Sequence, residues 1–377
     1  FIDAYQLQTV TVGSGVQYLD LDMFRYCYDL TAVSVAVGNP YYTDIDGVVY
    51  NKAGDTLVLY PFGKGENYVV PAGVANIDIL GDTDYDFLNI SFDPASTQFV
   101  TEDGVTYDAG KTKVIFCDKE KAGAYDMPDT VTQIVDGAFE DCTQLTSVAV
   151  SENVTSIVYR AFADCASLAE VSLPEKLQSI DAQAFAGAGL ESIDIPEGTT
   201  SIGEYAFSDC GNLTGIVIPE GMTSIGAGAF YDCSNLTDIT IPASVTNIGK
   251  SAFNCWDWDD TDTEIRVSIP DLAAWCAIDF GDSTANPLNH GADLYLNGEK
   301  VTRLKVPNGV TDIQAYAFYG CGSLTSAILP VGVTRIGNSA FSDCSSLTDI
   351  TIPDSVTSIG GSAFARCTAL ASITIPD

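Results

Sequence analysis

Carboxylates are the residues most able to do chemistry in this chain, since 51 of its 377 residues are Asp or Glu and only 16 are Lys or Arg. Two acidic runs place several oxygen ligands on a short loop, which is what calcium needs. The candidate ligands are Asp82, Asp84 and Asp86 in the first run and Asp257, Asp259 and Asp262 in the second. Phe87 stands where an EF-hand loop requires glycine. The sequence favours solvated loops over calcium sites, and we predict no metal.

His290 is the only histidine of the chain. A site with several histidine ligands is therefore impossible, and His290 is the sole candidate base for a Ser or Cys nucleophile of the usual kind. It lies between Asn289 and Gly291, a sequence typical of a turn. We therefore predict a structural or surface role for this histidine, no catalytic residue and no cofactor.

Seven of the eleven cysteines occupy one place in a repeated pattern, three residues after a phenylalanine: Cys142, Cys165, Cys210, Cys233, Cys321, Cys344 and Cys367. Equivalent positions in successive units point the same way, so these cysteines predict a ladder of small buried residues rather than disulfides. The total is odd, which leaves at least one thiol outside any intrachain bridge. No Cys-x-x-Cys pair occurs, which disfavours zinc and thioredoxin-like redox chemistry.

The elements that position all these residues repeat along the chain. An Ala-Phe pair recurs every 22 or 23 residues, with one gap of 65, at Phe139, Phe162, Phe185, Phe207, Phe230, Phe253, Phe318, Phe341 and Phe364. A fixed period of this length is typical of a solenoid, in which each unit packs only on its neighbours. Such a body offers an extended surface rather than one deep catalytic pocket.

One regular unit shows the physics of the repeat. The pattern Leu-x-x-Ile-x-Ile at 236–241 predicts a short parallel strand, and Pro242 ends the pairing because it has no amide hydrogen. Gly249 suits a backbone turn, and Phe253 is expected to fill the core of its coil. We therefore predict a β-rich solenoid, a leucine-rich repeat right-handed coil with a parallel concave sheet and β-hairpin inserts.

A single solenoid is expected over residues 1–377, with irregular repeats and two hairpin inserts in 1–130, regular repeats in 131–253, a third insert in 254–306 and regular repeats in 307–377. The first two inserts look like duplicates at an offset of 57 residues, since Asp46-Gly47 matches Asp103-Gly104. In the third insert, Asp271 predicts a helix cap and Asn297-Gly298 a two-residue hairpin turn. The chain starts without Met and stops within a repeat, so we expect a segment of a longer protein.

This repeat resembles that of the BspA-like leucine-rich repeat family of bacterial surface proteins, which reads Leu-x-x-Ile-x-Ile-Pro, then Val-x-x-Ile-Gly, then Ala-Phe-x-x-Cys. The resemblance covers nearly the whole chain. It implies an exported or surface-attached protein of host-associated bacteria, and some members act as adhesins for host matrix proteins. The sequence departs from the pattern at Ala188, where the repeat has Cys, at Cys255, which comes one residue early, in the 22-residue unit that ends at Phe207, and in 77–92, which lacks Ala-Phe.

The formal net charge of −35 repels phosphate backbones, so nucleic acid is excluded as a partner. No apolar run is long enough to span a bilayer. We therefore predict a non-enzymatic protein of the cell surface or the extracellular space, which mediates adhesion or protein recognition with a host or cell-surface protein as partner. The alternative is a spacer or stalk that presents a functional module elsewhere in the same polypeptide.

Two groups of residues are candidates for contact with such a partner. The predicted strands expose small hydroxylic or acidic residues such as Thr237, Asp238 and Thr240, whereas the inserts carry the aromatic residues Tyr41, Tyr42, Trp256 and Trp258. Loops that a rigid scaffold positions are free to carry large exposed side chains. We predict that a partner binds on the inserts; the concave strands are the competing site, and packing of the inserts onto the coil is the alternative role of the aromatic rings.

Overall fold

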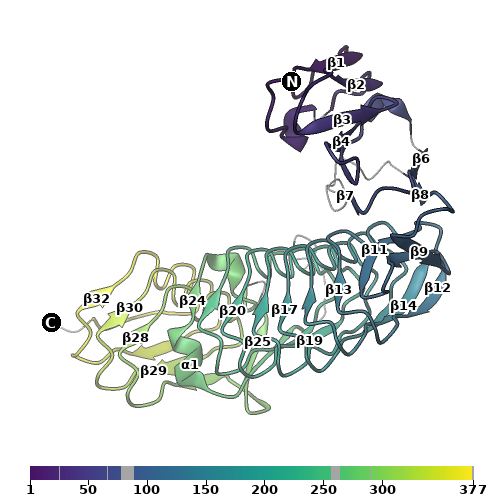
Figure 1. Ribbon diagram of the computed structural model, residues 1–377. Coiled ribbons are helices and arrows are strands. Elements are labelled where there is room, and N and C mark those ends of the chain that lie inside the picture. Colours follow the sequence, from purple (N-terminus) through teal and green to yellow (C-terminus); the bar gives the residue numbers. More distant parts are fainter. Residues whose placement is uncertain (25, 66, 78–88, 256–263, 290, 376–377) are drawn as a thin grey trace.

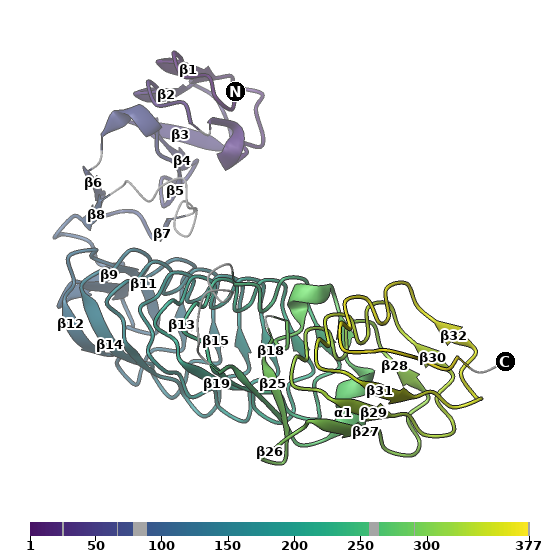
Figure 2. The same cartoon turned by 180° about the vertical axis from the view of Figure 1, so that it is seen from behind.

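The computed structural model describes all residues of the chain except 25, 66, 78–88, 256–263, 290 and 376–377. Figure 1 and Figure 2 show an elongated body of stacked coils that runs from β9 (Phe99–Glu102) to β32 (Ser358–Ile359). The strands from β1 (Thr9–Val12) to β8 (Asn89–Phe92) stand beyond one end of this body. The predicted β-solenoid with parallel sheets is confirmed.

The Leu-x-x-Ile-x-Ile segments form the parallel strands that we name the first sheet. In register, Ile216 faces Ile239, which faces Val267, so the apolar positions of successive coils stack in one column. The strands of the first sheet are hydrogen-bonded in three separate groups: β12 (Gly123–Asp126), β14 (Leu145–Ala149) and β16 (Glu170–Ser172); β19 (Gly215–Val217), β21 (Asp238–Thr240), β23 (Arg266–Ile269) and β25 (Asp293–Leu296); and β27 (Arg303–Lys305), β29 (Ser326–Ile328) and β31 (Asp349–Thr351).

Each regular coil also carries a second strand of two residues, which the sequence analysis does not anticipate. These strands pair in parallel as a second sheet, in which Ile202, Ile225 and Ile248 stack inward. They are hydrogen-bonded in two separate groups: β15 (Ser156–Ile157), β17 (Ser179–Ile180), β18 (Ser201–Ile202), β20 (Ser224–Ile225), β22 (Asn247–Ile248) and β24 (Asp279–Phe280); and β28 (Asp312–Ile313), β30 (Arg335–Ile336) and β32. A strand of two residues is too short to show the alternation of apolar and polar residues by which strands are recognised in a sequence. These strands pair because successive coils stack.

A glycine follows six of the nine second strands, and at Gly249 its role differs from the predicted one. Gly249 does not have a positive φ; instead, a Cβ placed on it would lie 2.4 Å from the backbone nitrogen of Ala227 in the preceding coil. The left-handed positions flank the Ala-Phe pair, as at Tyr205 (φ 54°) and Asp209 (φ 58°) on either side of Phe207. Glycine is thus needed at 249 for close approach of two backbones rather than for a turn.

The core of the body is a column of stacked phenylalanine rings. Phe207 is fully buried, and its ring centroid lies 5.3 Å from that of Phe185 and 5.4 Å from that of Phe230. All eleven cysteines are buried thiols. In the regular coils the thiol donates to the phenylalanine carbonyl of the preceding coil, as from Cys233 Sγ to Phe207 O at 3.0 Å. The predicted column of Phe and ladder of buried Cys are both present.

One coil departs from the regular pattern. The sequence predicts a strand at 190–195, but the structure has none there, and the first sheet is interrupted between β16 and β19. Leu190, Ile193 and Ile195 remain buried. This coil is one residue shorter than its neighbours, and Gly189 sits against the preceding coil so closely that a Cβ would lie 2.2 Å from Ala166 O. The shortened coil keeps its apolar packing and loses its strand pairing.

The two hairpin inserts are duplicates, as predicted from the offset of 57 residues. Each forms an antiparallel three-stranded unit extended by one parallel strand, and in each two tyrosine hydroxyls hydrogen-bond to each other, those of Tyr50 and half-buried Tyr68 in the first and those of buried Tyr107 and Tyr125 in the second. The strands are β3 (Tyr42–Ile45), β4 (Val48–Asn51), β5 (Thr56–Leu59) and β7 (Asn76–Ile77) in the first unit, and β9, β10 (Val105–Asp108), β11 (Lys113–Cys117) and β13 (Gln133–Ile134) in the second.

The region 254–306 continues the coil rather than only projecting from it. β23 and β25 extend the first sheet, and β24 extends the second. Between them, α1 (Leu272–Ala277) begins at Asp271, whose Oδ1 accepts from the nitrogens of Ala273 and Ala274, as predicted. β25 and β26 (Glu299–Lys300) form the predicted hairpin, with positive φ at Asn297 and Gly298.

Among the residues that the structure describes, buried hydrophobic side chains form three clusters, one within 12–59, one within 48–74 and one that runs through the long body from 105 to 367. The division of the chain into a single solenoid stays a prediction. The remaining elements are β2 (Ala32–Val35), paired with β1; β6 (Asn67–Val70), paired with β8; and the 3-10 turns Leu21–Phe24, Phe62–Lys64 and Ser283–Ala285.

Candidate functional site

Five of the predicted contact residues lie in described parts of the chain, and the others do not. Tyr41, Tyr42, Thr237, Asp238 and Thr240 are described. The residues outside the described ranges are Trp256, Trp258, His290 and all six predicted calcium ligands, Asp82, Asp84, Asp86, Asp257, Asp259 and Asp262. Their roles stay predictions.

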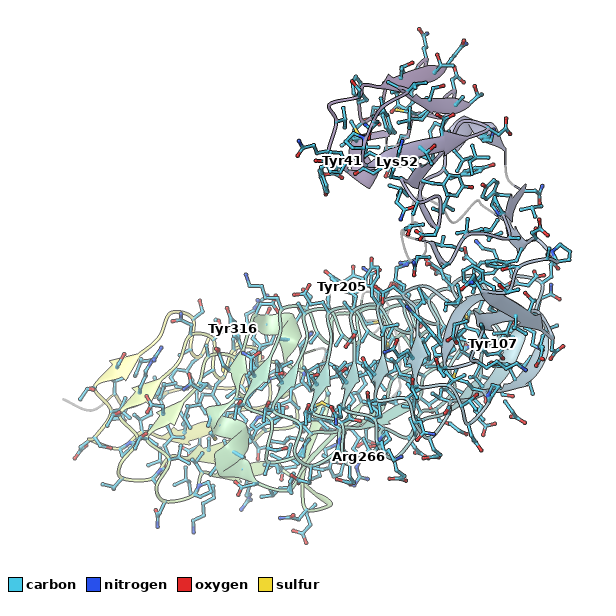
Figure 3. All side chains as sticks on the ribbon, in the orientation of Figure 1. Tyr41, Lys52, Tyr107, Tyr205, Arg266 and Tyr316 are labelled. Carbon is cyan, nitrogen blue, oxygen red and sulfur yellow. The ribbon has the colours of Figure 1, made fainter. Side chains whose placement is uncertain are left out.

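The two neighbouring tyrosines of the first insert have different environments. The Oδ1 of buried Asn39 accepts from the nitrogens of both Tyr41 and Tyr42 and so fixes the start of the hairpin. The Tyr42 hydroxyl accepts from Leu19 N at 3.1 Å and donates to Gln17 O at 3.3 Å, and its ring packs on the core. Tyr41 is 44% exposed, and Figure 3 shows it on the N-terminal part of the chain. Only Tyr41 of the pair is available to a partner.

Thr237, Asp238 and Thr240 lie together on the outer face of the first sheet. Asp238 is exposed, whereas Thr237 and Thr240 are half-buried. The Thr237 hydroxyl donates to the carbonyl of Thr214 in the preceding coil at 3.3 Å. The same bond recurs in the C-terminal coils, from Thr325 to Thr302 and from Thr348 to Thr325. These hydroxyls therefore help to hold successive coils together, which is a scaffold role.

The first sheet also carries an arginine and a tyrosine that the sequence analysis assigned to an insert and did not single out. Parallel pairing sets Asp238 opposite Arg266, and Thr240 opposite Ser268, which is opposite Tyr295. The guanidinium of Arg266 lies over the Tyr295 ring, 4.2 Å from its centroid, in a cation–π contact. Figure 3 marks Arg266 on the edge of the body opposite Tyr205 and Tyr316. The signal was present in the alternating sequence Ile-Arg-Val-Ser-Ile at 265–269, within the long gap between Ala-Phe pairs.

Acidic groups surround this pair. The Tyr295 hydroxyl donates to Glu264 Oε1 at 2.9 Å, and this hydrogen bond raises the pKa of Tyr295. Lys300 pairs with Asp293 and lies 3.4 Å from Glu264, and the contact with Asp293 raises the pKa of Lys300. We name the outward-facing group Asp238, Thr240, Glu264, Arg266 and Tyr295 the Arg266 patch.

The Arg266 patch brings two predicted residues together with two residue types that often dominate binding energy, Arg and Tyr. Tyr41 is not part of it, because Tyr41 belongs to the N-terminal part of the chain. In the part of the chain that the structure describes, no cluster of three or more His, Cys, Asp or Glu side chains could hold a metal ion. Within the same ranges, no helix has the length and apolar character needed to cross a bilayer.

The repeats match a family model described as the BspA type leucine-rich repeat region, with 6 copies. The matched residues are 113–188, 178–268 and 291–377, more than half of the chain. The chain belongs to the BspA-type leucine-rich repeat family.

Solved structures with a similar chain course are leucine-rich repeat proteins of bacteria. A leucine-rich repeat protein from Bacteroides ovatus is 27% identical, with 74% of this chain and 73% of that chain covered and a TM-score of 0.48. The pneumococcal vaccine antigen PcpA is 16% identical, with 71% and 63% covered and a TM-score of 0.46. A leucine-rich cell surface protein from Faecalibacterium prausnitzii is 23% identical, with 97% and 78% covered and a TM-score of 0.34. None of the curated proteins matches this BspA-type chain.

Proposed function

We propose that this BspA-type protein is an exported, non-enzymatic recognition protein that acts at the cell surface or outside the cell, and that it binds a protein partner through the Arg266 patch. Adhesion to a host or cell-surface protein is the biological role that fits this proposal. The interior supports it, because the body is filled by packed rings and aliphatic side chains. Functional groups are therefore offered on the outside of the coil.

The observation that carries the proposal is the stacked Arg266–Tyr295 pair beside Asp238 on a regular sheet. Elsewhere on the first sheet, the outward positions include threonines such as Thr348, which bonds to the preceding coil, the exposed apolar residues Val217 and Ile328, and the cations Arg303 and Lys305. The patch differs because it sets a planar cation, an aromatic ring and exposed carboxylates within reach of one surface. The net charge of −35 favours a partner with a basic surface and predicts binding that weakens with salt.

The test is a surface plasmon resonance screen of residues 1–377 against purified collagens, laminin and fibronectin, followed by variants of the patch. We expect Arg266→Ala combined with Tyr295→Ala to weaken binding of the partner at least about tenfold, the effect of losing a hot-spot pair. Tyr41→Ser tests the competing site on the first insert; Tyr42→Ser is not used, since the Tyr42 ring packs against the core and its loss would disturb the fold.

Three results would count against this site. Loss of binding with Tyr41→Ser but not with the patch variant would place the contact on the insert. Equal binding by both variants would exclude both surfaces. Failure of all matrix proteins to bind would favour the alternative role, a spacer that presents another module of the same polypeptide.

A further inference from the structure

A second feature lies on the edge of the coil where the chain turns at the Ala-Phe pairs. In the regular coils, the nitrogen of each repeat Phe donates to the carbonyl of the next coil's Ala, as from Phe207 to Ala229 and from Phe318 to Ala340. This ladder is interrupted between Phe253 and Phe318, because the coil between them has no Ala-Phe pair. Phe253 N donates to Thr284 O instead.

Side chains replace backbone groups on the other side of the interruption. The Ala317 carbonyl accepts from Trp275 Nε1 at 2.7 Å and from Asn286 Nδ2 at 3.2 Å. Tyr316, which Figure 3 labels on the same edge as Tyr205, packs edge-on against Tyr319 with centroids 6.2 Å apart. Beside Tyr319, next to this interruption, the surface of the coil is hollowed.

This hollow is an open pocket of about 600 Å³, within the range of roughly 300 to 1,000 Å³ typical of ligand sites. Its wall comes from successive coils and includes Asn254, Thr284, Asn289, Tyr319, Asp343 and Arg366. Among the described lining residues there is no aliphatic side chain. The pocket therefore does not suit a lipid or another apolar ligand.

One buried group in the wall lacks a partner. The side chain of Asn289 is 96% buried, since only 4% of the residue is exposed, and its Nδ2 makes no hydrogen bond within the described structure. Leaving a buried amide donor unsatisfied costs about 1 to 3 kcal/mol. Gly320 packs so closely that a Cβ would lie 3.0 Å from Asn289 Cα, so this glycine lets the two segments meet and holds Asn289 in place.

The other groups of the wall both donate and accept. Arg366 Nε lies 3.0 Å from Asp343 Oδ1, so the two formal charges cancel each other. The Thr284 hydroxyl donates to Asp282 Oδ1 at 3.0 Å and can still accept, and Tyr319 adds a half-buried ring. With a net charge of −35 on the whole chain and no unpaired cation in the described wall, an anionic ligand is disfavoured.

We propose that this pocket binds one or two units of an uncharged saccharide, with Asn289 Nδ2 donating to a sugar hydroxyl. A sugar hydroxyl accepts and donates at the same atom, which suits a wall of mixed donors and acceptors. The Tyr319 ring offers a flat face to the C–H side of a sugar ring. A peptide would need apolar pockets for its side chains, and the described wall offers none. This site is separate from the Arg266 patch, which lies on the first sheet.

The first experiment applies fluorescently labelled residues 1–377 to a glycan array. The array carries neutral, sialylated and sulfated glycans, and it includes mammalian glycans as well as bacterial and plant oligosaccharides. Comparison of the mammalian glycans with the bacterial and plant oligosaccharides distinguishes a host glycan from a microbial or dietary one. We expect binding to neutral glycans. Binding only to charged glycans, or to no glycan, would overturn the proposal. A pocket that binds peptides but no saccharide would also overturn it.

The second experiment measures the best neutral oligosaccharide by isothermal titration calorimetry against matched variants. Asn289→Ala removes the unpaired donor and should weaken binding about tenfold, and its melting temperature is measured to show that the fold is retained. Asn289→Asp, similar in shape but without the donor, should weaken it at least as much. Asn212→Ala removes an exposed asparagine elsewhere and should have no effect.

A second pair of variants keeps the test decisive if position 289 tolerates no change. Tyr319→Phe retains the ring and should bind within about twofold of the unaltered chain, whereas Tyr319→Ala should lose about tenfold, the order expected for a ring contact. Unaltered affinity in both Asn289→Ala and Tyr319→Ala would overturn the assignment. Binding of a matrix protein at the Arg266 patch should persist in these variants, so failure of one proposal is distinguishable from failure of the other.

Discussion

Replacement of Phe207 by alanine is the perturbation that most directly measures the packing of the coil. The ring is fully buried and lies between two parallel neighbours, Phe185 at 5.3 Å and 7° and Phe230 at 5.4 Å and 0°. Removing a large buried aromatic costs about 3 to 5 kcal/mol, because transfer free energy is lost and a cavity remains. Since each coil packs only on its neighbours, we expect the loss to weaken the coils on both sides.

The assay is urea unfolding followed by far-ultraviolet circular dichroism, with Phe364→Ala as the matched control. Phe364 is only partly buried, and its ring stacks on that of Phe341 at the end of the column, with centroids 5.6 Å apart. We expect the control to lose about half as much stability as Phe207→Ala, because it buries less and leaves a smaller cavity. A loss below about 1 kcal/mol for Phe207→Ala, or an equal loss for both variants, would refute the account of the ring column.

Three further predictions follow from glycine 249 and from the buried thiols. Gly249→Ala should destabilise the fold by about 1 to 3 kcal/mol through overpacking against Ala227, whereas Gly73→Ala, which has open space around it, should be neutral within about 0.5 kcal/mol; urea midpoints check this. Burial raises the pKa of Cys210, Cys276 and Cys321 to about 12, so the folded state keeps these protons while unfolded thiols ionise near 9. Stability should be constant below pH 8 and fall from pH 9 towards 12 by about 1.4 kcal/mol per pH unit for each thiol, and a rise in stability over that window would contradict the assignment. Iodoacetamide should label few of the eleven cysteines at pH 8 before denaturation and nearly all after it, as mass spectrometry would count; rapid labelling of Cys233 in the folded chain would be inconsistent with its burial.

The periodic features of the fold could be predicted because they leave a mark in every unit. The Ala-Phe pair, the strand of the first sheet and the cysteine three residues after Phe all repeat, and each has one physical cause, burial. Local turn chemistry was equally readable, as at Asn297-Gly298, where both residues have positive φ. These signals depend on near neighbours in the sequence.

Other features depend on contacts between coils and leave no local mark. The second sheet consists of residue pairs such as Ser224–Ile225, whose pairing exists only because coils stack. Gly249 is required by the backbone of the preceding coil, which its own neighbours in the sequence do not reveal. The one-residue deletion was visible, but the loss of a strand at 190–195 depends on pairing with two other coils.

The candidate sites were harder to predict for the same reason. Tyr41 and Tyr42 are alike in sequence, and only the structure shows that Tyr42 bonds to the loop at Gln17 while Tyr41 is exposed. Arg266 and Tyr295 were hidden in the 65-residue gap, because the repeat pattern there lacks its Ala-Phe mark. The pocket at Asn289 draws its wall from several coils, so no stretch of sequence contains it.

The most direct test of the central claim, recognition through the Arg266 patch, uses two segments with the same sequence. Residues 236–242 and 347–353 both read Leu-Thr-Asp-Ile-Thr-Ile-Pro, yet only the first lies beside Arg266 and Tyr295. The triple variant Thr237→Lys, Asp238→Lys and Thr240→Lys is compared with Thr348→Lys, Asp349→Lys and Thr351→Lys, which removes the equivalent bond to the preceding coil. With affinity for the screened matrix protein measured by surface plasmon resonance, the account predicts a loss of at least about tenfold for the first variant and less than about twofold for the second. Equal losses, or a loss confined to the second variant, would contradict it.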